Sequence, residues 1–91
     1  MPYALIRQRF TDYTRWRTAF DSVTEVRRAA GMNLVFVALN AADQQEAIVL
    51  FEVTDPQKAR EHAGSQLLAD AHQRAGVIDG SSHTLLLHGV Q

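Results

Sequence analysis

Two neighbouring runs of the chain are apolar on both of the faces that a strand presents: Met32-Asn33-Leu34-Val35-Phe36-Val37-Ala38-Leu39 and Ala47-Ile48-Val49-Leu50-Phe51-Glu52-Val53. A strand with one face in water alternates apolar and polar residues. Both faces of these two strands therefore need cover. The rest of the chain offers only two helical regions, and if both lie on one side of the sheet, the other side must be covered by something outside the chain.

The first half of the chain predicts a strand followed by a helix. Residues 3–10 alternate as a strand, and Thr11 is the expected N-cap of a helix that runs to residue 30. Apolar side chains recur every three or four residues along this helix. Gly31 is expected to end it.

The second half predicts two more strands, a divided helix and a last strand. The apolar runs form strands at about 32–40 and 46–53, joined by a hairpin loop at 41–45. The second helix is expected to begin at Asp55-Pro56, to be interrupted at Gly64-Ser65 and to end at Gly76, with the last strand at 83–88.

The resulting order, βαββαβ, predicts an α+β fold with a four-stranded antiparallel sheet. Crossovers between parallel strands are right-handed, and two crossovers of the same hand place both helical regions on one side of the sheet. The opposite side is left bare. The same face of a second copy would cover it in a two-fold homodimer, since that symmetry requires a self-complementary surface.

Length and composition indicate one small globular domain, residues 1–91. The chain is 46% hydrophobic and 21% charged, with a net charge of −1. This charge gives no field that would attract nucleic acid or an anionic membrane. No cysteine is present, which excludes disulfides, thiolate catalysis and cysteine-based zinc sites. Without a signal-peptide pattern or an apolar run of roughly 20 residues, a cytoplasmic location is expected.

Four segments carry a resemblance to a known family: Phe10-Thr11-Asp12-Tyr13-Thr14-Arg15-Trp16, Phe20-Asp21, the helix exit from Arg27 to Gly31, and Ala75-Gly76-Val77. They resemble small dimeric α/β-barrel proteins related to antibiotic-biosynthesis monooxygenases. The resemblance implies a ferredoxin-like monomer whose sheet pairs with that of a second copy into a barrel enclosing a cavity. Activities in this superfamily include cofactor-independent oxygenation of aromatic polyketides, polyketide cyclisation, lactone isomerisation and haem degradation.

Most catalytic residues of that superfamily have no counterpart at the matching positions. The cavity tryptophan of the polyketide oxygenases lies on a strand, whereas Trp16 is expected on the first helix. The haem-degrading members use an asparagine on the first strand, where this chain has Arg7 or Gln8. Relatives that resemble the chain more closely often have histidine at the position of Gln8.

Arg27 is the charged residue with the most unusual expected position. At about 100° per residue it lies about 20° from both Trp16 and Phe20 on the helix, within the stripe that faces the sheet. A buried guanidinium needs a carboxylate or several acceptors. One interpretation is that its side chain extends to water or caps carbonyl groups. The other is that it pairs with Glu52 or with an anionic ligand.

The strands carry the remaining polar candidates. Arg7 and Arg9 share a strand face with Tyr3, and Glu52 lies in the third strand. If that face lines the barrel, these groups orient a ligand in an apolar pocket, and a desolvated Glu52 becomes a general base. Alternatively, they form a salt-bridged rim or a dimer contact.

Four histidines are present, and their spacing predicts no metal site. His62 is expected on the inner side of the second helix, more typical of a hydrogen-bonded core histidine than of a catalyst. His83 begins the last strand and is expected near the cavity mouth. His72 and His88 are expected at the surface.

The sequence thus predicts a homodimeric barrel that binds a small apolar or aromatic molecule and, in the fuller form of the hypothesis, oxygenates or cyclises it without a metal or organic cofactor. The catalytic candidates are Glu52, His83 and Arg7, and the candidates for ligand binding are Tyr3, Arg9, Arg27 and His62. An alternative is a non-catalytic binding or assembly protein whose barrel is filled by side chains. A third hypothesis, haem binding through His62 or His72, is tested by a Soret shift on adding haem.

Overall fold

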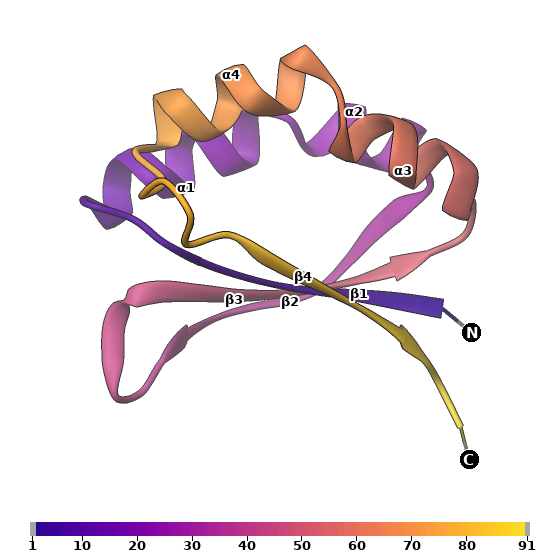
Figure 1. Ribbon diagram of the computed structural model, residues 1–91, viewed down its shortest axis with the longest axis horizontal. Coiled ribbons are helices and arrows are strands. Elements are labelled where there is room, and N and C mark those ends of the chain that lie inside the picture. Colours follow the sequence, from indigo (N-terminus) through magenta and orange to yellow (C-terminus); the bar gives the residue numbers. More distant parts are fainter. Residues whose placement is uncertain (1, 91) are drawn as a thin grey trace.

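The computed structural model describes residues 2–90 and has two layers, a sheet and a layer of helices on one of its faces (Figure 1). In chain order the elements are β1 (Pro2–Arg9), α1 (Tyr13–Ser22), α2 (Thr24–Ala29), β2 (Met32–Asn40), β3 (Asp43–Val53), α3 (Pro56–Ala63), α4 (Gln66–Ala75) and β4 (His83–His88). The sheet order is β2-β3-β1-β4, and all neighbouring strands are antiparallel. The predicted ferredoxin-like βαββαβ order is confirmed, with each helical region divided in two.

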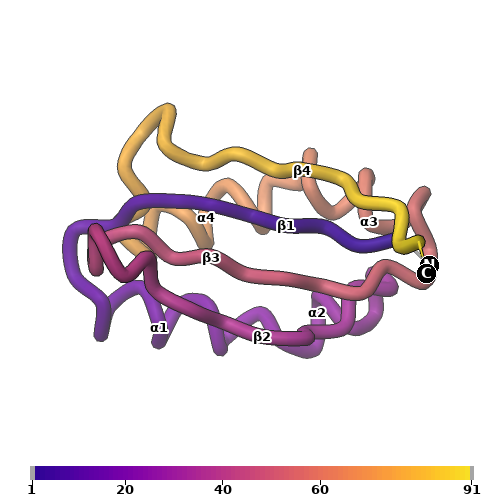
Figure 2. The backbone as a smooth tube through the Cα atoms, turned by 90° about the horizontal axis from the view of Figure 1, so that it is seen from below, coloured from indigo at the N-terminus to yellow at the C-terminus, as the bar shows by residue number. Residues whose placement is uncertain are grey.

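Alternation along β3 separates the two faces of the sheet. Ala47, Val49 and Phe51 are no more than 2% exposed and pack under the helices. Ile48 and Leu50, between them, point to the opposite face and are half-buried. Figure 2 views the molecule from this opposite side, and the strands lie in front of the helix layer. The prediction that both helical regions cover the same side is therefore confirmed.

The side of the sheet without helices is apolar, and we call it the open face. Its apolar members are Leu5, Phe36, Ala38, Ile48, Leu50, Leu85 and Leu87, which the strand registers place on one side. Leu85 is 59% exposed and Phe36 is 44% exposed. In a single chain this surface is therefore exposed to water, as the two-sided apolar pattern of the strands predicted.

Asp12, and not Thr11, caps α1. The Asp12 carboxylate accepts a hydrogen bond from the Arg15 backbone N–H at 3.3 Å. The Thr11 backbone N–H instead donates to the Gly76 carbonyl at 3.2 Å, which ties the start of this helical region to the end of α4. The predicted cap was wrong by one residue because both residue types suit the N-cap position.

A break at Val23 divides the helix that was expected to be continuous to residue 30. Val23 has φ −110° and ψ 17°, outside the helical range. The hydroxyl groups on either side bond to nearby carbonyls, Ser22 to Ala19 at 2.6 Å and Thr24 to Asp21 at 2.8 Å. Such bonds compete with the regular helical pattern, which accounts for the break.

The second helical region follows the sequence prediction closely. Asp55 caps α3 by accepting from the Lys58 backbone N–H at 3.1 Å, and Pro56 occupies the first turn. Ser65 caps α4 by accepting from the Leu68 backbone N–H at 3.2 Å. Gly76 ends α4 in the left-handed conformation, with φ 72°.

The hairpin loop is shorter than predicted. β3 begins at Asp43 rather than at 46, which leaves Ala41-Ala42 as the turn. The Asn40 side-chain oxygen accepts from the Ala42 backbone N–H at 2.9 Å, and Asp43 forms an ion pair with Arg9 at 3.0 Å. These polar contacts extend the strand pairing into a segment whose composition suggested a loop.

An aromatic row forms the centre of the core. Trp16 stacks between Phe10 and Phe20, with ring centroids 5.6 and 4.9 Å away, and Phe20 stacks on Phe51 at 6.3 Å. Two further aromatic residues, Tyr13 and Phe36, lie outside this buried row. Tyr13 is 42% exposed, and Phe36 lies on the open face. Within residues 2–90, no helix combines the length and the apolar character needed to span a membrane.

Candidate ligand-binding site

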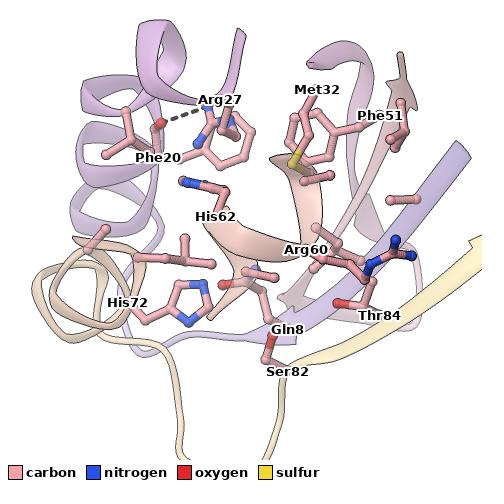
Figure 3. A pocket seen from close by; sticks show the side chains of 18 of the residues that line it. Gln8, Phe20, Arg27, Met32, Phe51, Arg60, His62, His72, Ser82 and Thr84 are labelled. Atoms are coloured by element: carbon pink, nitrogen blue, oxygen red, sulfur yellow. Dashed lines mark hydrogen bonds between the residues drawn. The ribbon is translucent and has the colours of Figure 1, made fainter. Parts of the chain in front are cut away.

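A cavity of about 390 Å³ lies between the helix layer and the sheet (Figure 3). Its wall is mostly apolar and includes Trp16, Phe20, Met32, Phe51, Leu68 and Leu86. The polar side chains that interrupt this wall are Gln8, Arg27, Arg60, His62, His72, Ser82 and Thr84. Cavities of this size with few polar groups are typical of sites for small organic molecules.

The cavity opens between α3 and the edge strand β4. Arg60, Thr84 and Leu86 line it and are exposed, and Figure 3 shows Arg60 and Thr84 close together on the side away from Arg27. The opposite end, near Phe20 and Arg27, is closed by the buried core. The site therefore has a mouth that is exposed to solvent and a deep end whose polar side chains, Arg27 and His62, are buried.

Arg27 occupies the deep end and is only 6% exposed. One guanidinium nitrogen, Nη2, donates to the Phe20 carbonyl at 2.8 Å, and the guanidinium carbon lies 3.9 Å from the centre of the Phe20 ring. Burial lowers the pKa of Arg27 to about 10, and the attraction of Asp21 partly opposes this shift. The side chain therefore remains a cation at pH 7, inside an apolar cavity.

The break at Val23 accounts for this contact. Because α1 ends at Ser22, the Phe20 carbonyl lies in the last turn of a helix, where it accepts a long hydrogen bond of 3.4 Å from the Val23 backbone N–H. Arg27, on the following helix, donates a second and shorter hydrogen bond to it. The interpretation that Arg27 caps a carbonyl thus agrees with the structure, whereas Glu52 lies on the opposite face of β3 and forms no ion pair with it.

His62 comes from α3 and is 8% exposed. Figure 3 shows its ring directed toward Arg27 and Phe20. Its Nε2 atom is buried and has no hydrogen-bond partner in the described part of the chain, so the predicted hydrogen-bonded core histidine is not what the structure shows. Burial, followed by the positive charge of Arg27, lowers the pKa of His62 below its usual value. The ring is therefore neutral at pH 7.

His72 also lines the cavity, although a surface position was expected. It is half-buried on α4, and burial lowers its pKa. The signal was present in the sequence, because His72 follows Leu68 by four residues and shares its helix face. His62 and His72, the two histidines of the haem hypothesis, therefore line the same cavity.

Gln8 is a polar residue of the site that the sequence reasoning did not assign. It is 6% exposed, and its side-chain oxygen accepts a hydrogen bond from the Trp16 indole N–H at 3.3 Å. The alternation Ala4, Ile6, Gln8, Phe10 already placed it on the inner face of the first strand. Its contact fixes the orientation of the indole in the cavity wall.

Four of the seven candidate residues from the sequence project from the open face, away from the cavity. Arg7 pairs with Glu46 at 2.9 Å, and Arg9 pairs with Asp43 at 3.0 Å. The strand register places Glu52 opposite Tyr3 and His83 opposite Arg7. The structure therefore separates Arg7, Arg9, Glu52 and His83 from Arg27 and His62.

Tyr3 belongs to both groups. It alternates with the buried Ala4 and so lies on the open-face side of β1, yet part of the residue also lines the cavity. Of the seven candidates, the cavity wall includes Arg27, His62 and Tyr3.

Comparisons with known proteins identify the fold. Neither a family model nor a curated protein matches the sequence. Among solved structures, a proposed antibiotic biosynthesis monooxygenase from Nitrosomonas europaea matches with a TM-score of 0.73 and 12% identity, over 100% of both chains. A second proposed enzyme of that name, from Deinococcus radiodurans, matches with a TM-score of 0.73 and 10% identity, over 100% of this chain and 94% of its own.

A third similar structure, an uncharacterised NIPSNAP domain protein from Burkholderia xenovorans, has a TM-score of 0.69 and 10% identity, over 99% of this chain and 95% of its own. Identities this low show the fold alone. The chain therefore has the ferredoxin-like fold of antibiotic biosynthesis monooxygenase-like proteins over its whole length.

Proposed function

We propose that the protein is a homodimer in which each subunit binds a small aromatic molecule in the cavity between helices and sheet, and that it oxygenates or cyclises this molecule without a cofactor. The observation that carries the proposal is the cavity itself, about 390 Å³ in volume and lined mainly by apolar and aromatic side chains. A few inward polar groups give such a cavity the means to orient a ligand.

The open face supports the proposed dimer. Leu85 and Phe36 are more than two-fifths exposed, on a sheet side with several further apolar residues. Exposed apolar patches of this kind mark interaction surfaces. A two-fold axis would bring the same patch of a second copy over it. Arg7, Arg9, Glu52 and His83 would then lie inside the barrel or at its rim.

The alternative, a binding or assembly protein without catalysis, is supported by a different observation. The open face carries large side chains, among them Leu50, Leu85 and Leu87, that can fill the space between two sheets. A filled barrel would leave the ligand site on the helix side of each sheet untouched. The two hypotheses therefore differ in turnover and not in ligand binding.

Binding is best followed through Trp16. It is the single tryptophan of the chain and lines the cavity, so a ligand that enters should change its fluorescence. A panel of one- to three-ring aromatic compounds provides the screen. Saturable fluorescence changes with bicyclic or tricyclic compounds are expected, and a panel without any saturable change contradicts the proposal.

Turnover is tested with an anthrone and oxygen. In this reaction the anthrone methylene becomes a carbonyl, one atom of O₂ enters the product, and the other leaves as water. Oxygen uptake and quinone absorbance should rise together. Variants then locate the chemistry: loss of turnover in Arg7→Gln, Glu52→Gln or His83→Gln would assign it to the open face. Loss confined to His62→Gln would assign it to the cavity, and full activity in the first three variants would remove those residues from the catalytic set.

A further inference from the structure

The deep end of the cavity holds a positive charge that Asp21 attracts from a distance but that forms no ion pair with any residue the structure describes. No ion pair within residues 2–90 includes Arg27, and the one hydrogen bond found for its guanidinium goes to the uncharged Phe20 carbonyl. A buried cation without a counter-ion is costly, which makes this an unusual state for a merely structural residue. Arg27 is also one of the residues that line the cavity.

His62 provides a second, independent sign of a missing partner. Its Nε2 is buried without a hydrogen bond, although buried side-chain polar atoms are normally paired. It lies close enough to Arg27 for that charge to act on its pKa, and Figure 3 shows both side chains directed to the same end of the cavity. In a neutral imidazole, Nε2 can be the protonated nitrogen, and its N–H can then donate a hydrogen bond to an anionic oxygen.

We infer that Arg27 and His62 form a carboxylate subsite, and that the ligand is an aromatic carboxylate held with its acid group at the deep end of the cavity. This inference rests on the proposed function, which supplies the ligand site. A carboxylate has two oxygens, so it can accept from the guanidinium and from the imidazole together. It also supplies the negative charge that the cavity lacks.

The rest of the cavity fits the remainder of such a ligand. Trp16, Met32 and Phe51 provide an apolar wall for the ring. Arg60, the other arginine of the wall, is exposed at the mouth and donates to Gln57 at 3.2 Å. Because water screens its charge, Arg60 attracts an anion less strongly than the buried Arg27 does. The carboxylate is therefore expected to point inward and the ring outward.

The first experiment compares 2-naphthoate with 2-naphthamide, which has nearly the same shape and no charge. Affinities are measured by isothermal titration calorimetry on the wild-type protein at pH 7 and low salt. We expect naphthoate to bind at least about 10-fold more tightly, the ratio that one charge-assisted contact of about 1.4 kcal/mol provides.

Two variants then locate the preference. Arg27→Met removes the charge and keeps much of the side-chain volume, and we expect it to bind both compounds with equal affinity. Arg28→Met is the matched control, because Arg28 is exposed, pairs with Glu25 at 2.9 Å and does not line the cavity. It should retain the wild-type preference. His62→Leu should reduce the preference for naphthoate and leave naphthamide binding in place.

The outcomes separate the subsite from the proposed function. Equal affinities in the wild type, or a preference that survives in Arg27→Met, would overturn the carboxylate subsite and leave ligand binding intact. Failure of both compounds to bind would overturn the carboxylate subsite, whereas the proposed ligand site fails only if the whole aromatic panel fails to bind. Should Arg27→Met fail to fold, intermolecular NOEs in the wild type decide instead. Contacts from the naphthoate protons beside the carboxylate to Arg27 and His62 are expected, whereas contacts to Arg60 would place the acid at the mouth and refute the inference.

Discussion

The guanidinium carbon of Arg27 lies 3.9 Å from the centre of the Phe20 ring, while its Nη2 donates to the carbonyl of the same residue at 2.8 Å. One residue thus offers both a π-face and a carbonyl to the cation. Both contacts stabilise a buried guanidinium, but neither neutralises it. The balance between these contacts and the cost of burial gives the first prediction.

Arg27→Met should leave the protein as stable as the wild type, or more stable by up to about 2 kcal/mol, because an apolar side chain of similar volume avoids the burial of an unpaired charge. The free energy of unfolding is measured by urea denaturation at fixed protein concentration. Arg28→Met, which removes an exposed i,i+3 pair, should change it by less than about 0.5 kcal/mol. A loss above about 1 kcal/mol in Arg27→Met would show that Arg27 serves stability rather than binding.

His62 should make the fold sensitive to acid. Burial and the charge of Arg27 lower its pKa in the folded state below the ordinary 6.5, so at mildly acidic pH the unfolded chain binds a proton that the folded chain does not. The free energy of unfolding therefore falls as the pH drops below about 6.5, and the loss levels off once the folded-state pKa is passed. His72, whose pKa is also lowered by burial, adds to this effect.

Urea denaturation of the wild type, His62→Leu and His72→Leu between pH 7.5 and 5 checks this prediction. Each variant should show a flatter decline than the wild type, and His62→Leu should also gain stability at pH 7 because it removes the unpartnered Nε2. His88→Leu is the control, because His88 is exposed at the end of β4 and does not line the cavity. Parallel declines in all four proteins would contradict the assignment.

Three glycines test how the backbone holds the helix layer on the sheet. Gly31 has φ +76°, and a Cβ there would lie 2.9 Å from both the backbone nitrogen and the Cβ of Asp55. Gly80 has φ +77° with open space around it, and Gly64 has an ordinary φ of −94° and its nearest neighbour at 3.9 Å. The three positions therefore separate backbone strain from steric conflict.

Substitution by alanine should affect stability in a fixed order. Gly31→Ala should lower the free energy of unfolding by more than about 2 kcal/mol, because backbone strain and steric conflict add. Gly80→Ala should lower it by about 1 kcal/mol, from strain alone. Gly64→Ala should leave it unchanged or raise it by up to about 1 kcal/mol. Thermal or urea unfolding measures all three. Equal effects of Gly31→Ala and Gly80→Ala would show that the contact with Asp55 is unimportant.

A charge on the open face should prevent association. Leu85 is 59% exposed in the single chain, so Leu85→Lys leaves the fold intact and places a cation where a second sheet would pack. We expect the variant to sediment as a monomer at concentrations where the wild type is dimeric. Leu67→Lys is the control, because Leu67 is 45% exposed on α4, in the helix layer. If the Leu67 variant dissociates and the Leu85 variant does not, the copies meet through the helices.

Most of the fold was predictable because the signals are local. The caps at Asp55 and Ser65 and the left-handed Gly76 each follow from one or two residue types, and the apolar runs of β2 and β3 identify both as strands of the sheet. The break at Val23 was missed because the apolar spacing continues through it. Its cause, two hydroxyl groups that bond to neighbouring carbonyls, does not change that spacing.

The site was harder to predict than the fold. Arg27 was recognised as unusual because it interrupts an apolar helix stripe, and His62 was expected on the inner side of the second helical region. Their proximity depends on how α2 and α3 pack on the sheet, which helix periodicity does not specify. Arg7, Arg9 and Glu52 were proposed from strand positions, but strand alternation alone does not say which face lines the cavity.

Sedimentation equilibrium of the wild-type protein at micromolar concentration tests most directly whether a second copy covers the open face. We expect a stable dimer, and we expect the backbone amides of β2 and β4 to exchange hydrogen more slowly once the dimer forms. A monomer that persists through this concentration range, with Phe36 and Leu85 exposed to water, would contradict this expectation.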